Sequence, residues 1–204
     1  MACAPGRGMP MTGGEFHDLV RSSRTFRRFD EGSRVTREQL LGLVDTARFA
    51  PTGNNTQLLR FHVVDDPATV EHCAASHGWA ALFRDWDGPK PGERPTGYIA
   101  VCGPTGAGGS AIRNLDAGIA AQTIMLAARS EGLGGCIIKS FKPSLADDLG
   151  ISQQGYEILV LLAIGVPAER VVLEEVDSGH GTHYWRDDQG THHVPKLPLD
   201  DLLI

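Results

Sequence analysis

The sequence predicts one domain of mixed helices and strands, either an α+β or an α/β sandwich. Four short apolar stretches have the length and composition of strands, and helical patterns lie between them. One of these helices opens with a capping box, and a longer one is apolar on nearly every side. Because 41% of the 204 residues are hydrophobic, the chain can bury one sizeable core. We therefore expect a single domain.

The first part of the chain is predicted to hold two helices joined by an arginine-rich stretch. Residues 1–14 are rich in glycine and proline, and we expect a disordered tail there. A short helix follows over residues 15–22. Residues 36–39, Thr-Arg-Glu-Gln, form the capping box, and apolar residues recur after it at helical spacing, which places a second helix before Pro51.

The remaining elements alternate between strands and helices as far as residue 166. We expect strands over 59–64, 97–102, 136–140 and 156–166, and helices over 67–76 and 113–130 and from about Pro143. The helix over 113–130 is apolar almost all round, which implies burial on every side and is typical of a subunit interface in a small chain. The strand over 156–166 is continuously apolar at its centre, which predicts burial of both faces. The tail after Pro167 is polar and offers few core candidates.

Composition and charge argue against several classes of function. A formal net charge of −6 is unsuited to a nucleic-acid surface. The longest nearly apolar segment, residues 117–128, is shorter than the ~20 residues that a membrane helix needs. The four cysteines lack C-x-x-C spacing, so they suggest neither a zinc site nor a disulfide framework. We expect a soluble protein in a reducing, cytoplasmic setting.

A glycine-rich segment, residues 103–111, fits a dinucleotide-binding fingerprint poorly. Residues 106–111 have the G-x-G-x-x-A form, which would suit a Rossmann dehydrogenase. The acidic residue expected about 20 residues later should end a strand, whereas Glu131 precedes its predicted strand. We therefore favour a flexible surface turn.

The histidines and paired carboxylates predict no metal site and no acid–base pair. The eight histidines show no metal-binding spacing, so surface or packing roles are favoured. The pairs Asp187-Asp188 and Asp200-Asp201 lie in polar, turn-like sequence, where solvated carboxylates are expected. No serine, cysteine or threonine lies in the context of a nucleophile elbow.

Two segments between Ser23 and Gln57 carry the main functional signal. The first, residues 24–29, is Arg-Thr-Phe-Arg-Arg-Phe, called here the arginine run; the second, residues 50–57, is Ala-Pro-Thr-Gly-Asn-Asn-Thr-Gln, called the amide turn. Guanidinium groups bind phosphate through two parallel bonds, and hydrocarbon beside them suits a planar ring. The alternative is a solvated loop in which only the two phenylalanines anchor the core. Read together, the segments predict a site for a large anionic ligand with a ring.

With a third segment in the expected order, the chain resembles the FMN-dependent nitroreductase family. Members tend to carry R-R-S/T-x-R-x-F, a helix, a turn of the type A-P-S-x-x-N-x-Q-P-W, and a helix ending in G-L-G before a strand. Here these correspond to residues 23–29, 50–58 and 132–140. The resemblance spans residues 15–202. It implies an α+β fold with a central mixed sheet of four to five strands flanked by helices, one domain over 15–204, and a C-terminal tail that extends onto a partner subunit.

The resemblance also implies which residues hold FMN at the interface of a homodimer. Those carried over from the family motifs are Arg24, Thr25, Arg27, Pro51, Thr52, Gly53, Asn55, the backbone of Lys139 and Ser140, and Lys196. Residues of the arginine run would lie near the phosphate, the ribityl chain and the pyrimidine edge of the flavin. Those of the amide turn would contact the FMN bound mainly by the other subunit, so the two segments would serve opposite sides of the dimer.

The activity that the resemblance implies is transfer of a hydride from NADH or NADPH onto flavin N5, followed by ping-pong reduction of a nitroaromatic, a quinone or a similar acceptor. Because the cofactor performs this chemistry, no catalytic side chain is expected. Trp79, Phe83 and Trp86 are candidates to line the acceptor pocket, with a purely structural role as the alternative. Residues 182–188 form an added loop, interpreted as wrapping or lid structure.

Departures from the family pattern leave a rival function open. Ser23 replaces a common first arginine, Leu58 and Leu59 replace Pro-Trp, and Leu197 stands where a second basic residue is frequent. These changes predict weaker FMN binding or a different phosphate shell. A flavin-binding store or sensor without nicotinamide turnover is therefore the alternative.

Overall fold

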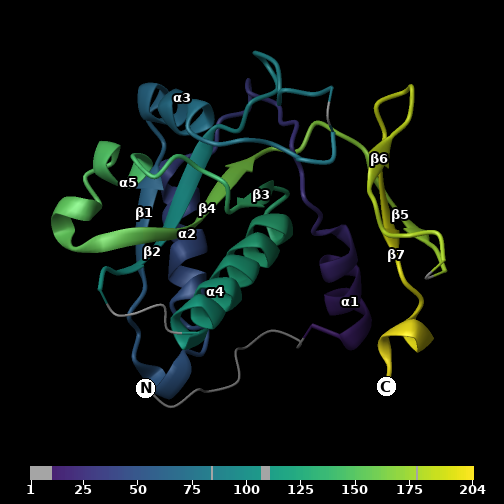
Figure 1. Ribbon diagram of the computed structural model, residues 1–204, viewed down its shortest axis with the longest axis horizontal. Coiled ribbons are helices and arrows are strands. Elements are labelled where there is room, and N and C mark those ends of the chain that lie inside the picture. Colours follow the sequence, from purple (N-terminus) through teal and green to yellow (C-terminus); the bar gives the residue numbers. More distant parts are fainter. Residues whose placement is uncertain (1–10, 84, 107–110, 178) are drawn as a thin grey trace.

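A computed structural model of the protein describes residues 11–83, 85–106, 111–177 and 179–204 (Figure 1). In chain order the elements are α1 (Gly13–Ser22), α2 (Arg37–Ala47), the 3-10 turn η1 (Gly53–Asn55), β1 (Arg60–Val64), α3 (Pro67–Ala75), β2 (Gly97–Pro104), α4 (Ala111–Ser130), β3 (Gly134–Ile138), α5 (Leu145–Asp148), η2 (Ser152–Gln154), β4 (Tyr156–Gly165), β5 (Val171–Glu175), β6 (Trp185–Arg186), β7 (His192–Lys196) and η3 (Leu199–Leu202). They form a body built on one sheet and a C-terminal arm with a smaller sheet.

The body sheet has the strand order β1-β2-β4-β3, and its neighbouring strands pair antiparallel. The expected α+β class is confirmed. A Rossmann dehydrogenase is excluded, because its sheet is mostly parallel; residues 107–110 of its fingerprint lie outside the described residues. Where a mixed sheet was expected, the strands pair antiparallel, and a parallel contact enters at the isolated bridge between Thr25 and Gly135.

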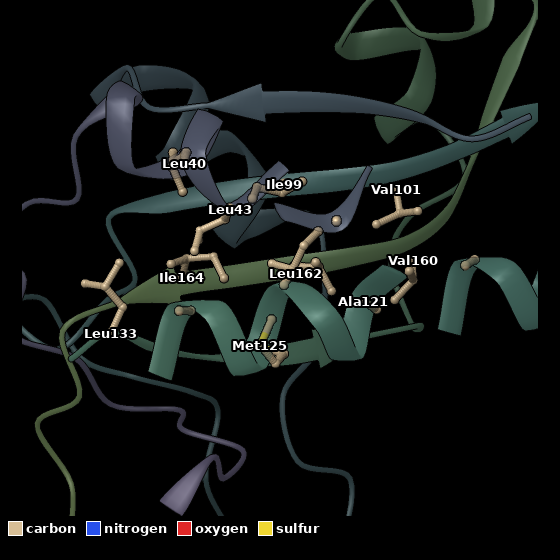
Figure 2. Close-up of a cluster of buried hydrophobic side chains, with 14 of the residues drawn as sticks. Leu40, Leu43, Ile99, Val101, Ala121, Met125, Leu133, Val160, Leu162 and Ile164 are labelled. Atoms are coloured by element: carbon tan, nitrogen blue, oxygen red, sulfur yellow. The ribbon is translucent and has the colours of Figure 1, made fainter. Parts of the chain in front are cut away.

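The core lies on both faces of β2 and β4, which run through the middle of the sheet. On one face Ile99 and Leu162 pack with side chains of α2 and α4, among them Leu43 (Figure 2). On the other face Tyr98 and Leu161 pack with residues of α3 and α5. Successive residues of a strand point to opposite faces, so an uninterrupted apolar strand fills both layers. The predicted burial of both faces of this strand is confirmed.

Both N-terminal helices begin with a capping box. In α2, the Thr36 hydroxyl accepts the Gln39 N–H at 3.2 Å and the Gln39 side chain accepts the Thr36 N–H at 3.0 Å, as predicted. In α1, Thr12 and Glu15 make the same exchange, which starts the helix at Gly13, inside the expected tail. Residues 1–10 of that tail lie outside the described residues.

Two elements differ from the sequence expectation near the predicted site. Helix α4 is not buried on every side of this chain, since Ile112 and Leu115 are 51% and 63% exposed. Its predicted role as a subunit interface stays a prediction. Strand β3 ends at Ile138, so Lys139 and Ser140 follow the strand instead of ending it.

The three-stranded sheet of the arm was not predicted, and the expected extension of this tail onto a partner subunit stays a prediction. Strand β7 pairs parallel with β5 and antiparallel with β6, and Figure 1 shows this sheet as a separate layer at the edge of the molecule. Its strands are short and half-buried, so they lack the apolar runs that predict strands. Across the described ranges, no helix combines the length and apolar character needed to cross a membrane.

Candidate functional site

The arginine run is fixed between two parts of the body. The Phe26 N–H donates to the Gly135 carbonyl at 2.9 Å, which lays the run along the start of β3. Further on, the Ala168 N–H donates to the Arg28 carbonyl at 3.0 Å. Phe26 and Phe29 are buried, as the core-anchor interpretation predicted. The run therefore has a defined path, and Thr25 is exposed immediately before the first anchor.

The Arg27 side chain is buried and incompletely bonded. It is 8% exposed, and its guanidinium carbon lies 4.9 Å from the centre of the Tyr184 ring. Its Nε and Nη1 atoms are buried and have no hydrogen-bond partner among the described residues. The solvated-loop alternative is wrong for this residue, because the side chain is buried. A buried guanidinium without hydrogen-bond partners carries a desolvation cost that a ligand can offset.

Arg24 is tied back to helix α1, which ends two residues before it. Its Nη2 atom donates to the Val20 carbonyl at 2.6 Å, while its Nε atom is buried with no partner in the described part of the chain. Burial, and secondarily the nearby Arg21, lower the pKa of Arg24 from its ordinary value. The run therefore presents two partly desolvated guanidinium groups, which favours an anionic or acceptor-rich ligand.

Glu169, which no sequence motif contained, accepts hydrogen bonds from the backbone of this run. Its side chain is 1% exposed, and its Oε1 atom accepts the backbone N–H groups of Arg27 and, at 3.1 Å, Arg28. Its Oε2 atom accepts from Arg186 Nη2 at 2.8 Å. A single glutamate in a polar tail carries no sequence signal for such a contact, so sequence reasoning missed it.

The aromatic residues proposed for the acceptor pocket contact the arm. The Arg186 guanidinium lies 4.8 Å from the Phe83 ring centre and 4.3 Å from that of Trp86. His192 packs edge-on against Phe83, with ring centres 5.5 Å apart. Burial and the neighbouring arginines lower the pKa of His192 to about 4. Phe83 and Trp86 therefore have packing contacts with the arm, and Trp79 packs against His77 and Trp86. The place of the three rings in an acceptor pocket stays a prediction.

Strand β3 offers polar main-chain groups on the side away from β4. The N–H and C=O of one strand residue point the same way, and residues two apart repeat that direction. Because the Gly135 carbonyl faces the arginine run, the polar groups of Ile137 face the same side. The Ile137 side chain is itself 46% exposed. This edge can pair with the rim of a flat ligand.

Lys139 and Ser140 continue this edge beyond the strand. The Lys139 ammonium donates to the Leu159 carbonyl at 2.7 Å, so the side chain points back to β4. The main chain of Lys139 is therefore the part of this residue that can bind a ligand. The Ser140 carbonyl accepts the Gly78 N–H at 3.3 Å. The structure thus brings Lys139 and Ser140 to the same edge as the arginine run, as expected from their motif.

The amide turn is held by α4 in an unusual backbone conformation. The Gly53 N–H donates to the buried Asp116 carboxylate at 3.0 Å, and the Thr52 hydroxyl accepts the Gln57 N–H at 3.2 Å. A Cβ atom on Gly53 would lie 2.2 Å from Ile112 Cγ2, so a side chain does not fit there. Asn54, Asn55 and Gln57 all have φ near +50°. Non-glycine residues in that region are uncommon and cluster at binding sites.

The amide turn and the arginine run lie at opposite ends of α4 within one chain. The turn bonds to Asp116, whereas the Ser23 hydroxyl donates to the Met125 carbonyl at 3.4 Å. Asp116 and Met125 are nine positions apart in the helix, about 13 Å along its axis. A shallow apolar pocket lies beside the turn, lined by Pro51, Thr52, Phe61 and Asp116 among others, and it does not reach the run.

Lys196 is not brought to the run in this chain. It is exposed at the end of β7, where its carbonyl accepts the Val176 N–H at 3.0 Å. The start of that strand, His192, packs on Tyr184, which covers Arg27. Four strand residues span about 13 Å, so Lys196 lies well away from Arg27. Its assignment to the phosphate stays a prediction.

The residues present fit a flavin nucleotide at the run. Arg24 and Arg27, on either side of the exposed Thr25 in the sequence, have guanidinium nitrogens without a partner among the described residues, and Thr25 bridges to the edge of β3. These donors match a phosphate and the polar rim of a ring. In the part of the chain that the structure describes, histidine, cysteine and carboxylate side chains form no group that could hold a metal ion.

Comparisons with known proteins identify the family and the fold. A family model described as the nitroreductase family matches residues 20–166. YdgI of Bacillus subtilis, named as a candidate NAD(P)H nitroreductase, is 24% identical over 76% of this chain and 90% of its own.

Solved structures are similar in fold. A candidate NAD(P)H:FMN oxidoreductase of Staphylococcus epidermidis has a TM-score of 0.68 at 19% identity, covering 97% of this chain and 99% of its own. A candidate nitroreductase of Desulfovibrio desulfuricans, solved with FMN, has a TM-score of 0.66 at 23% identity, covering 95% and 97%. Both matches extend through the arm, which lies beyond the residues that the family model matches.

Proposed function

This chain belongs to the nitroreductase family, and on that premise we propose that it reduces a nitroaromatic, a quinone or a similar acceptor with electrons from NADH or NADPH. It is an NAD(P)H-dependent oxidoreductase with FMN as its cofactor. When bound, FMN would supply the redox chemistry, which is hydride transfer from the nicotinamide and ping-pong reduction of the acceptor.

One observation carries the assignment to this chain. Arg27 is buried with two guanidinium nitrogens unpartnered among the described residues, directly beside an open strand edge. Buried polar groups are normally bonded, and the exceptions call for a ligand or a functional role. A flavin nucleotide provides both a phosphate for the run and a hydrogen-bonding ring for the edge of β3.

The side chains have distinct roles in this proposal. Arg24 and the Thr25 hydroxyl hold the phosphate and ribityl chain, and Arg27 approaches the pyrimidine edge of the ring. A cation at that edge stabilises negative charge and so raises the reduction potential of the cofactor. The main chain of Lys139 and Ser140 positions the ring along the edge of β3.

The amide turn serves the site of a second subunit in this proposal. Within one chain, the residue of α4 that bonds to the turn, Asp116, lies about 13 Å along the helix axis from Met125, the residue that bonds to Ser23 just before the run. Packing α4 antiparallel on its copy would bring the turn of one subunit to the run of the other. The exposed Ile112 and Leu115 on α4 supply apolar surface for that contact.

The purified protein tests the cofactor and the reaction. We expect a yellow protein whose released chromophore is FMN, and anaerobic mixing with NADH or NADPH should bleach it. Adding a nitroaromatic or a quinone should then restore the oxidised spectrum. A flavin that stays oxidised with both nicotinamides would instead support a store or sensor, the alternative suggested by Leu58, which is 42% exposed where the family has proline.

The Arg27→Ala variant tests the residue that carries the assignment. Removing the guanidinium should lower FMN affinity and the rate of flavin reduction together. Arg34→Ala, which removes an exposed arginine bonded to the Asp65 carbonyl, is the matched control and should change neither. Full flavin content and unchanged reduction in Arg27→Ala would show that our assignment of this arginine is wrong.

A further inference from the structure

We infer that Glu169 is a positioning residue that fixes the backbone of the arginine run in the shape needed to bind the flavin. This inference rests on the proposed function. Glu169 lies three residues beyond the end of the family-model match, in the segment that leads into the arm. It touches no predicted ligand atom and acts through Arg27 and Arg28.

The Glu169 carboxylate accepts backbone hydrogen bonds where a short antiparallel ladder ends. Residues 28–30 pair antiparallel with residues 166–168: the Asp30 N–H donates to the Val166 carbonyl at 2.8 Å, and the Ala168 N–H donates to the Arg28 carbonyl at 3.0 Å. Beyond this point, among the described residues, the ladder offers no main-chain acceptor to the N–H groups of Arg27 and Arg28. Glu169 Oε1 accepts both.

Burial makes these two bonds consequential. The Glu169 side chain is 1% exposed, and Arg27 is 8% exposed, so water does not readily replace a lost acceptor. A buried N–H without a partner costs far more than an exposed one. Removing the acceptor therefore forces the run to move, and the guanidinium of Arg27 moves with it.

The two oxygens of Glu169 separate two roles. Oε1 serves the backbone of the run, whereas Oε2 receives Arg186 Nη2 at 2.8 Å and so ties down the arm. Glutamine keeps an oxygen that can accept the two backbone N–H groups, but its NH₂ group faces the Arg186 donor. Alanine removes both contacts. The two substitutions thus distinguish positioning of the run from anchoring of the arm.

FMN binding to the purified apoprotein is the direct test. Titration by flavin fluorescence should show that Glu169→Ala weakens FMN binding about tenfold or more, because two buried N–H groups lose their acceptor. Glu169→Gln and Arg186→Met should stay within about threefold of wild type, since both leave an acceptor at the run. Glu174→Ala, which removes a carboxylate of the same arm bonded to His193, is the matched control and should bind FMN normally.

A second measurement separates positioning from loss of fold. In the FMN-saturated protein, Glu169→Ala should lower the flavin reduction potential and alter its visible circular dichroism, because Arg27 no longer lies correctly at the ring. Thermal unfolding of the apoproteins reports the structural effect alone. If Glu169→Ala fails to fold, Glu169→Leu and Glu169→Gln at low temperature provide the same contrast of acceptor against no acceptor.

The outcomes identify which statement fails. Wild-type affinity and potential in Glu169→Ala would overturn the inference while leaving the FMN assignment intact. Equal losses in Glu169→Ala and Arg186→Met would also overturn it, since anchoring of the arm would then explain the effect. Wild-type protein that binds no FMN would instead overturn the proposed function.

Discussion

The body and the arm are held together by different kinds of contact. In the body, β2 and β4 are buried along almost their whole length, and apolar side chains fill both faces of the sheet. In the arm, the strands are half-buried, and ion pairs and rings dominate: Arg186 with Glu169, and Trp185 stacked on His193. Apolar burial is non-directional, whereas these polar contacts depend on exact partners.

This difference predicts how each region responds to change. Apolar burial in the body stabilises the whole domain, so damage there should lower the free energy of unfolding globally. The contacts of the arm are local and partly exposed, so damage there should show as local opening. The segment that leads into the arm contributes Glu169 to the arginine run, which makes the local order of that segment relevant to the site.

The largest expected effect is truncation of a core residue in the body. Leu162 on β4 is fully buried, and Leu162→Ala should lower the free energy of unfolding by about 4 kcal/mol, from lost burial and the cavity left behind. Urea unfolding measures it. Leu41→Ala on α2, where the leucine is 47% exposed, is the control and should cost less than about 1 kcal/mol. Similar losses in both variants would contradict a core centred on β4.

A smaller effect is expected where β3 packs against β4. A Cβ atom on Gly135 would lie 2.2 Å from the Ala163 carbonyl oxygen, so Gly135→Ala must push the strands apart. We expect a loss of about 2 to 3 kcal/mol, typical of overpacking. Gly42→Ala on α2 is the opposite control: its added methyl meets nothing within 4 Å and should stabilise the helix by up to about 1 kcal/mol. A Gly135→Ala protein as stable as wild type would refute this close packing.

The arm should respond to acid through His192. Its folded pKa is about 4, against an ordinary 6.5, so the unfolded chain binds more protons between these values. The contribution of His192 to the free energy of unfolding is therefore fully present above pH 6.5. It falls as the pH drops toward 4, and at pH 5 about 2 kcal/mol has been lost. The measurement is urea unfolding at several pH values, comparing wild type with His192→Phe, which should lack this part of the slope.

His193, next to His192 on β7, is an internal control because its pKa shifts in the opposite direction, so its contribution to stability has the opposite pH dependence. Its hydrogen bond to Glu174, and a second to Asp187, raise its pKa. Stability from a raised histidine is present below its unfolded pKa and is lost as the pH rises through the folded value. His193→Gln should therefore alter the slope in the opposite sense to His192→Phe. Identical slopes in the two variants would contradict this account of the arm.

The smallest expected effect is loss of the ring stack in the arm. The ring centres of Trp185 and His193 lie 4.0 Å apart, the two rings are nearly parallel, and Trp185 is 45% exposed. Trp185→Ala should cost less than about 1 kcal/mol of global stability but speed amide hydrogen exchange in β6 and β7. Trp185→Phe retains a ring and should restore protection. Faster exchange in β2 as well would show that the arm and the body unfold together.

The sequence predicted the body well because its signals are local. The apolar run of β4 and the capping box of α2 each depend on residues close together in the chain, and both were confirmed. The box at Thr12 had the same form but was missed beside a glycine-rich tail. The arm escaped prediction because its strands depend on distant partners, such as Arg186 reaching Glu169 and Phe83.

The site divides in the same way. Motif spacing located the arginine run and the edge residues Lys139 and Ser140, which the fold brings together. It did not reveal that Arg27 is covered by Tyr184, or that Glu169 supports the run, because both contacts span well over a hundred residues. Those contacts follow from the three-dimensional path of the arm, which periodicity and motif do not encode.

The open edge of β3 has a consequence for the protein before it is loaded. A strand edge that is paired only at its start and carries an exposed apolar side chain, here Ile137, is a template on which other chains can add a strand. A flat ligand lying along that edge removes the template. Flavin supply during synthesis should thus govern solubility as well as activity, and cells starved of riboflavin should accumulate this protein in aggregates.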